Sequence, residues 1–252
     1  MRSATLLLLA VSLAPAICYA QSEALSLAQI LDRMQQAGAA DQDHNFAYTV
    51  TREYQLLAAG ATQASSDVVA EVSVIPPGEK QYVIVKSEGN ERGAAIVRRV
   101  LDHEAGMADH PQSYAIDAAN YDFALAGRET TDGHDCYVLQ ISPKRQAVGL
   151  LRGQVWVDAQ DFRVRRIEGE AAKSPSLWLR KLNLTLNFGE VNGVWLETST
   201  QAIADVRFAG KHMLTSRELE VRRATVSASI RRPRRHPPAG RLADDTAAWI
   251  AP

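Results

Sequence analysis

Alternating apolar and polar positions run through most of this chain and predict a protein built mainly of β-strands. The clearest case is the segment KLNLTLNF, residues 181–188, in which the leucines and Phe188 share one parity while the asparagines and the threonine share the other. Such alternation places one face in a core and the other in water, as in an antiparallel sheet. Comparable patterns predict further strands at 46–56, twice in 67–87, twice in 120–142, and at 153–158, 162–168, 194–210 and 212–221.

Two segments change to the period of a helix. The mature N-terminal part places apolar residues at i, i+3, i+4 and i+7, with Ser26 suited to cap the start and Gly38 suited to the residue past the end. The segment AAIVRRVLDHEAGM, residues 94–107, has a second apolar stripe, and Gly106 is its expected end. The four apolar positions of the first helix are Leu27, Ile30, Leu31 and Met34.

Short turns join most of the predicted strands. Pro76-Pro77-Gly78, Asn192-Gly193 and Gly210-Lys211 are typical of tight connections, which favours a meander of nine or ten antiparallel strands with two helices inserted. So many sequential strands must close, curl or stack as two sheets. The predicted fold class is therefore mainly β with α, built on antiparallel strands, and periodicity alone does not choose between a closed, a curled and a stacked arrangement.

The N-terminus predicts export. Arg2 precedes an apolar run over residues 6–13, which is too short for a permanent membrane anchor, and small residues stand before Gln21 as in a secretory cleavage site. Residues 1–20 are thus expected to be a signal peptide, and the mature protein to be periplasmic. A lipid-anchored form through Cys18 is the less favoured alternative, because Ile17 replaces the small residue usual before a lipidated cysteine.

The C-terminal part, residues 223–252, differs from the preceding domain at 21–222. Between Arg231 and Arg241 it holds five arginines and three prolines, which favours an extended, solvated chain. Such a tail could contact an anionic membrane surface or an acidic partner, or be a charged extension with no dedicated partner.

Composition narrows the classes of partner. The formal net charge is −1, which gives no general attraction to nucleic acid. After signal-peptide removal Cys136 is the one remaining cysteine, so no internal disulfide is expected and stability must come from packing. Outside the N-terminus no apolar run is long enough to span a membrane.

Catalytic and metal-binding motifs are not found in the sequence. It contains no glycine-rich phosphate loop, zinc-ligand spacing or serine-hydrolase elbow, and its six histidines are scattered. His134 and Cys136, two apart in GHDCY, are the sharpest candidates for thiol chemistry, but a cysteine at the start of an apolar strand is more often buried and inert. The chain is therefore predicted to be no enzyme and to hold no metal or cofactor.

Aromatic and leucine side chains on the predicted strands supply the candidate site. A curved sheet with two short helices has more apolar inner surface than the helices cover, and an acyl chain could supply the missing contacts at about 0.8 kcal/mol per methylene. The candidate cavity residues are Phe46, Tyr48, Tyr54, Phe123, Tyr137, Leu139, Trp156, Phe162, Leu184, Leu186, Phe188 and Trp195.

The second half of the chain resembles a known family. A G-R-E strand, a C-Y-V-L strand, the pair G-x-V-W-V-D and F-R-V-x-R-I-E-G, and a G-V-W-L strand follow one another between Tyr121 and Val221. In this order they resemble the outer-membrane lipoprotein-sorting family, the periplasmic carriers with a LolA/LolB-like fold. The single arginine that gates cargo in the dedicated carriers has no matching position here.

The resemblance implies a curved antiparallel sheet that forms an incomplete or half β-barrel, covered by short helices, around a hydrophobic cavity. Such a protein binds the acyl chains of a lipid or a lipidated protein and performs no chemistry. We therefore expect an exported binding protein, with a possible place in outer-membrane lipoprotein sorting. The alternative is an envelope regulatory or protein-interaction module on the same fold, since a periplasmic regulator that binds an anti-sigma factor shares it. Deleting residues 231–252 would separate the two if the tail carries the protein contact.

Overall fold

One curved sheet forms most of the molecule. The computed structural model describes residues 25–43, 46–58, 60–76 and 79–224, so the predicted signal peptide, the Arg231–Arg241 tail and part of the predicted turn at Pro76-Pro77-Gly78 lie outside the described residues. The elements are α1 (Leu27–Asp43), β1 (Tyr48–Ala58), β2 (Ser66–Ile75), β3 (Glu79–Gly89), α2 (Glu91–Ala108), a 3-10 turn (Pro111–Ser113), β4 (Tyr121–Thr131), β5 (His134–Pro143), β6 (Leu151–Asp158), β7 (Val164–Ala171), β8 (Leu179–Val191), β9 (Val194–Val206) and β10 (Gly210–Arg223).

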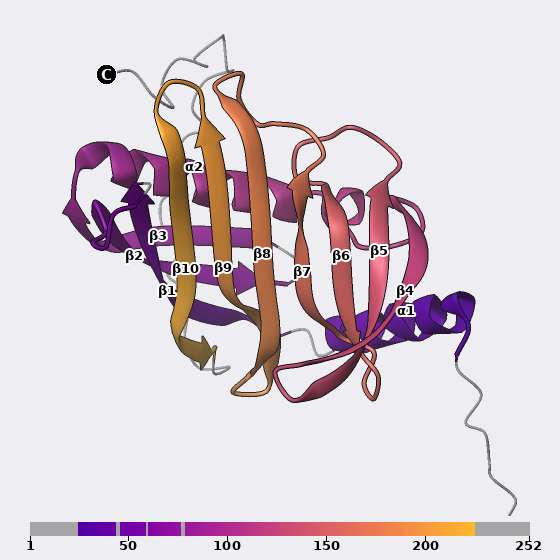
Figure 1. Cartoon of the computed structure of the whole chain (residues 1–252). Helices are drawn as coiled ribbons and strands as arrows, with labels where there is room; N and C mark the ends of the chain where they lie inside the picture. Colours follow the sequence, from indigo (N-terminus) through magenta and orange to yellow (C-terminus); the bar gives the residue numbers. More distant parts are fainter. Residues whose placement is uncertain (1–24, 44–45, 59, 77–78, 225–252) are drawn as a thin grey trace, which may run out of the picture.

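All ten strands belong to a single antiparallel sheet, which confirms the predicted fold class. Its order is β3-β2-β1-β10-β9-β8-β7-β6-β5-β4, so two meanders, β1–β3 and β4–β10, meet where the first strand pairs with the last. The sheet remains open, with β3 and β4 at its edges, and it curls as Figure 1 shows. Helix α2 connects the two edge strands.

Helix α1 covers the inner face of the β4–β7 end of the sheet. Ser26 and Gln29 cap its start reciprocally, because the Gln29 amide donates to Ser26 Oγ while Gln29 Oε1 accepts from the Ser26 amide. Ile30 is fully buried against Tyr137 and Leu139 and their neighbours. The prediction that Gly38 ends this helix is wrong, since α1 continues to Asp43.

Helix α2 covers the inner face of β1–β3. Asn90 caps its start by accepting from the Gly93 amide at 2.7 Å, and Val97 and Leu101 are buried beneath it with Val68 of β2. Gly106 does not end it, because the helix runs on to Ala108. In Figure 1 α2 lies behind the sheet, alongside β2 and β3, while α1 lies at the opposite end.

The β6–β7 hairpin departs from its predicted strand boundaries. Phe162, expected to begin the second strand, lies in the turn with φ +59°, and β7 begins two residues later. Its ring stacks on Tyr137 at 6.2 Å between centroids and is buried in the cluster beneath α1. That packing holds a bulky residue in a backbone conformation that it otherwise avoids.

The two helices cover the two ends of the concave face and leave its middle to β8, β9 and β10. Among the described residues, no helix is long and apolar enough to cross a membrane.

Candidate functional site: a cavity between the sheet and α2

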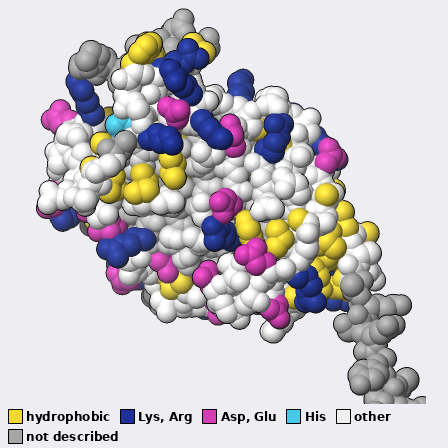
Figure 2. All heavy atoms as spheres, viewed as in Figure 1, with side chains coloured by type: hydrophobic (Ala, Val, Ile, Leu, Met, Phe, Trp, Pro, Cys, Tyr) yellow, Lys and Arg dark blue, Asp and Glu magenta, His cyan; other side chains and the backbone are white. Residues whose placement is uncertain are grey.

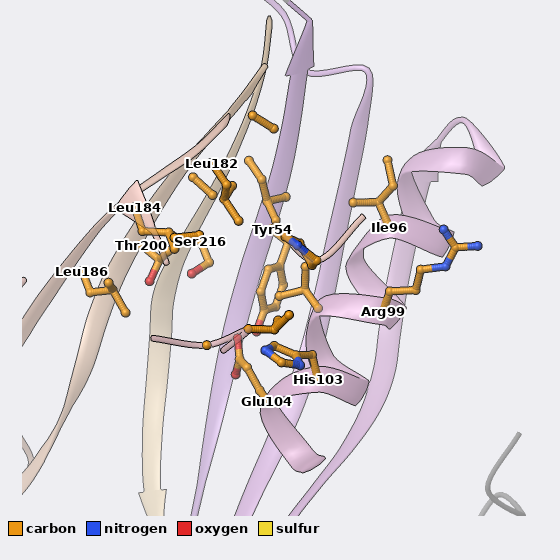
Figure 3. Close-up of a pocket in the computed structure, with 18 of the residues that line it drawn as sticks. Tyr54, Ile96, Arg99, His103, Glu104, Leu182, Leu184, Leu186, Thr200 and Ser216 are labelled. Atoms are coloured by element: carbon orange, nitrogen blue, oxygen red, sulfur yellow. The ribbon is translucent and has the colours of Figure 1, made fainter. Parts of the chain in front are cut away.

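A cavity of about 1070 Å³ lies between the middle strands and helix α2. Figure 3 shows Leu182, Leu184 and Leu186 on one side of it and Ile96 and His103 of α2 on the other. Its volume is slightly above the range of about 300–1,000 Å³ that is usual for ligand pockets. The cavity is therefore large enough for a lipid-sized ligand.

The wall of the cavity is largely aliphatic because four neighbouring strands each direct alternate residues into it, and most of these residues are leucine or alanine. The cross-strand pairs align Leu184 with Ala202, Ala202 with Leu214, and Leu214 with Leu56. Ala202 and Ala204 carry no atoms beyond Cβ, so the wall is recessed along β9. The aliphatic wall residues on these strands are Leu179, Leu182, Leu184 and Leu186 of β8, Ala202, Ala204 and Val206 of β9, Leu214 of β10, and Leu56 and Ala58 of β1.

One end of this wall is polar. The next aligned row carries Thr200, Ser216 and Tyr54 beside Leu186. Thr200 donates to a carboxylate oxygen of Glu197. An amphipathic ligand would thus meet aliphatic side chains along most of its length and hydrogen-bonding groups at this end.

A buried ion pair closes the polar end. Arg52 is 8% exposed, and its Nη1 lies 3.1 Å from Glu197 Oε1, while its Nη2 donates to the Glu197 carbonyl. A bulge in the β8–β9 ladder, where pairing shifts between Asn187 and Phe188, places an extra residue, Thr198, in β9. Since one extra residue reverses which side chains face inward, Glu197 lines the cavity although its parity differs from that of Thr200.

Helix α2 supplies a second carboxylate to this end. Glu104 lines the cavity, and burial raises the pKa of its carboxyl above the ordinary value, with Lys80 at 3.9 Å as the nearest opposing charge. Tyr54, 1% exposed, extends toward it in Figure 3, and burial followed by the Glu104 charge raises the pKa of its hydroxyl. Among the described residues, no partner of good hydrogen-bond geometry meets the Tyr54 hydroxyl, although Arg52 lies close enough to lower its pKa.

The structure brings three of the twelve predicted site residues, Tyr54, Leu184 and Leu186, to this cavity. It places eight of the other nine in packing clusters elsewhere, and Trp195 against two arginines. Tyr137, Leu139, Phe162, Phe123 and Phe188 pack in the cluster beneath α1; Phe46 and Tyr48 pack against Val50, Val194, Leu196 and Val221; Trp156 is buried with Cys136 and Val138; and Trp195 lies under the guanidinium groups of Arg163 and Arg165.

Sequence reasoning missed the small wall residues and the α2 side of the cavity. The segment QAIAD indicates the recessed wall, because its alanines, Ala202 and Ala204, occupy alternate positions of a strand and so share one face beside the leucines of β8. Ile96 and Val100 of α2 also line the cavity, but their helical stripe alone does not separate core from cavity.

The thiol candidate is poorly placed for chemistry. Cys136 is fully buried, and burial, with a smaller contribution from Asp158, raises the pKa of its thiol to about 11. His134 points its Nδ1 at Asp158, 3.0 Å away, and the Cys136 thiol donates a hydrogen bond to the His134 carbonyl oxygen. A thiol in this environment is protonated at neutral pH and is a weak nucleophile. Within the described residues no cluster of three His, Cys, Asp or Glu side chains could hold a metal ion.

One protein-family model matches the chain. It is described as "Uncharacterized protein" and covers residues 98–224, about half of the sequence. The chain belongs to this family. The segment shared with the family extends from within α2 to the end of β10, so it includes the strands of the cavity wall. No curated protein matches the sequence.

Solved structures with a similar fold are distant. A putative outer-membrane lipoprotein-sorting protein domain from Vibrio parahaemolyticus has 14% identity and a TM-score of 0.43, over 79% of this chain and 94% of that one. A DUF1329 family protein from Desulfovibrio piger has 14% identity and a TM-score of 0.42, over 80% and 95%. A LolA superfamily protein from Nitrosomonas europaea has 13% identity and a TM-score of 0.38, over 81% and 96%. Because these similarities are low, the function proposed below depends on the cavity itself.

Proposed function

We propose that this protein is an exported, non-catalytic carrier or receptor that holds an acyl chain of a lipid or a lipidated protein in the cavity between β8–β10 and α2. The observation that carries the proposal is the size of that cavity together with its aliphatic wall. Each methylene that leaves water for such a wall contributes about 0.8 kcal/mol, so a long acyl chain is the ligand that gains most from it.

The polar end of the cavity supports an amphipathic ligand over a plain hydrocarbon. Thr200, Ser216 and the Arg52–Glu197 pair lie at one end of the wall, and the rows beyond them carry leucine, alanine and valine with one further polar residue, His212 of β10. A lipid whose head lies near Thr200 would leave its chain along the aliphatic rows. Outer-membrane lipoprotein sorting, which the name of the Vibrio protein suggests for that protein, is the process in which such binding would have its place.

Filling the cavity tests the proposal. The double substitution Ala202→Phe and Ala204→Phe adds two rings to the recessed part of the wall and should abolish uptake of a fluorescent fatty acid by the purified mature protein. Lipid extraction followed by mass spectrometry should find co-purified lipid in the unmodified protein and none in the variant.

Ile203→Phe is the matched control, because Ile203 lies between the two alanines, is 36% exposed and does not line the cavity. It should bind the probe as the unmodified chain does. Unmodified protein that carries no lipid and takes up no acyl probe would contradict the proposal, as would full binding by the double variant.

A further inference from the structure

Two large hydrophobic side chains project into solvent near the mouth of the cavity. Phe208 is 93% exposed and Leu177 is 78% exposed, while the other exposed large hydrophobic residues in the described part of the chain have exposures of 36–53%. Leu177 lies in the connection between β7 and β8, and Phe208 lies in the turn between β9 and β10. Single exposed hydrophobic residues are common on proteins, but exposure this complete in two neighbouring loops is not.

These two loops are joined into one rim. The Arg207 amide donates to the Trp178 carbonyl at 2.8 Å, so the residues that follow Leu177 and precede Phe208 are directly hydrogen-bonded. Pro175 and Ala209, from the same two loops, line the cavity. We refer to residues 172–178 and 207–209 as the cavity rim.

Phe208 adopts a backbone conformation that its own packing does not explain. Its φ is +67°, in the left-handed region that a bulky side chain normally avoids. Phe162 is held at φ +59° by a buried stack on Tyr137, whereas the ring of Phe208 is almost wholly in solvent. Residues held in sparsely populated backbone conformations are concentrated at functional sites, so this turn is a candidate for one.

The rim and the residues next to it carry positive charge. Lys173, Arg180, Arg207 and Lys211 are all exposed, and within the described residues none of them forms an ion pair with a carboxylate. The segments 172–181 and 206–211 contain no acidic residue. Figure 2 shows hydrophobic side chains beside Lys and Arg side chains at the top of the molecule, where Figure 1 places the ends of β8, β9 and β10.

We propose that the cavity rim is a membrane-docking site, in which Leu177 and Phe208 insert into an anionic lipid surface while the four surrounding basic side chains contact its headgroups. An anionic membrane binds both features, because apolar side chains insert among its lipids and cations bind its headgroups. An acidic protein would account for the cations alone, and an uncharged membrane for the apolar side chains alone. Docking at the rim would place the mouth of the cavity against the membrane, where acyl chains enter or leave. The transfer of acyl chains between membrane and cavity rests on the proposed function, whereas the binding of the rim to a membrane does not.

Vesicle binding by the full mature chain tests the site. The unmodified protein should co-sediment with vesicles of equal parts phosphatidylglycerol and phosphatidylcholine, and much less with phosphatidylcholine alone. Leu177→Ser combined with Phe208→Ser should weaken binding to the anionic vesicles about tenfold or more, because two inserted side chains are lost. Phe208→Gly, which relieves the positive φ, should bind weakly too while unfolding at the same or a higher temperature.

Leu125→Ser with Leu219→Ser is the matched control, since these two residues are 43% and 48% exposed on strands away from the rim. This control should bind vesicles as the unmodified chain does. The proposal is overturned if the unmodified protein does not co-sediment with anionic vesicles. It is also overturned if the rim variant binds them as tightly as the unmodified protein, because binding would then belong to another part of the chain, such as the Arg231–Arg241 tail. It is equally overturned if the rim substitutions only convert a dimer to a monomer.

Uptake of the fatty-acid probe without vesicles separates this proposal from the proposed function. The rim variants should keep that uptake, whereas the variant with Phe at 202 and 204 should lose it and still bind vesicles.

Discussion

At the scale of single residues, two glycines allow β6 and β7 to approach closely. Gly153 pairs directly with Gly169, and a Cβ at Gly153 would lie 2.0 Å from the backbone oxygen of Glu168. Since a backbone atom cannot move aside as a side chain does, we expect Gly153→Ala to lower the free energy of unfolding by about 1–3 kcal/mol or more. Urea denaturation measures this directly.

Gly38→Ala is the companion variant and should act in the opposite direction. Gly38 lies inside α1, and apart from the adjoining helix backbone and its two chain neighbours no atom lies within 4 Å of the position its Cβ would take. Alanine is favoured over glycine in a helix interior by about 0.5–1 kcal/mol, so this variant should be more stable. Equal effects of the two substitutions would contradict the packing described for β6 and β7.

A second prediction at this scale concerns pH. Burial raises the pKa of Glu104 above its ordinary value of 4.5, so the folded protein binds this proton more tightly than the unfolded chain. Stability from this group is therefore greatest at low pH and is lost as the pH rises from about 4.5 through the folded pKa. We expect Glu104→Gln to be more stable than the unmodified protein at pH 7 and close to it near pH 4.

Asp122→Asn provides the control for this pH dependence. The Asp122 side chain is 76% exposed and lies 3.8 Å from Lys144, so its substitution should change stability little at either pH. A Glu104→Gln variant that is less stable at pH 7 would show that the carboxylate is stabilised in the folded state, contrary to the pKa direction given above.

At the scale of elements, local patterns were sufficient for the strands and their tight turns, but not for helix ends. Asn192-Gly193 forms its turn with positive φ at both residues because that dipeptide accommodates such angles. Gly38 and Gly106 were expected to end helices, yet both helices continue, since glycine weakens a helix interior without breaking it. The alternation of apolar residues predicts a strand that begins at Phe162. This is wrong because stacking on Tyr137, a tertiary contact that local sequence does not show, decides the conformation of Phe162.

Strand bulges set a second limit on what the sequence can predict. The alternation in β9 suggests one continuous parity, but the bulge around Thr198 turns Glu197 into the cavity. A one-residue irregularity of this kind reverses the facing of all residues beyond it and leaves no mark in the hydrophobic pattern. The buried Arg52–Glu197 pair could therefore not be predicted from the spacing of its two residues.

At the scale of the whole molecule, strand number and one-sided patterning predicted a mainly antiparallel β protein, and the family resemblance predicted the curved, incomplete barrel. Neither predicted the location of the cavity. Aromatic residues were chosen as wall candidates because they bury much surface, yet Tyr137 and Phe162 fill the space beneath α1. The cavity instead lies where inward side chains are small, as at Ala202 and Ala204, and where no helix fills the hollow. Which strands lie under which helix is a property of the assembled fold.

A ligand that occupies a hollow of about 1070 Å³ should make the stability of the whole molecule depend on ligand concentration. At a free ligand concentration of about 100 times Kd, binding adds about 2.7 kcal/mol to the free energy of unfolding. For a chain of this size each kcal/mol raises the Tm by about 2–4 °C, so a matching acyl ligand should raise it by roughly 5–10 °C.

Differential scanning calorimetry with and without the fatty-acid ligand measures this shift. The variant with Ala202→Phe and Ala204→Phe should show no ligand-dependent change in Tm, and Ile203→Phe should show the full change. If the filled variant still responded to the ligand, binding would occur outside the cavity. If the unmodified chain did not respond at saturating ligand, the hollow between β8–β10 and α2 would have no role in binding acyl chains, and the function would have to be sought on the outer surface of the sheet.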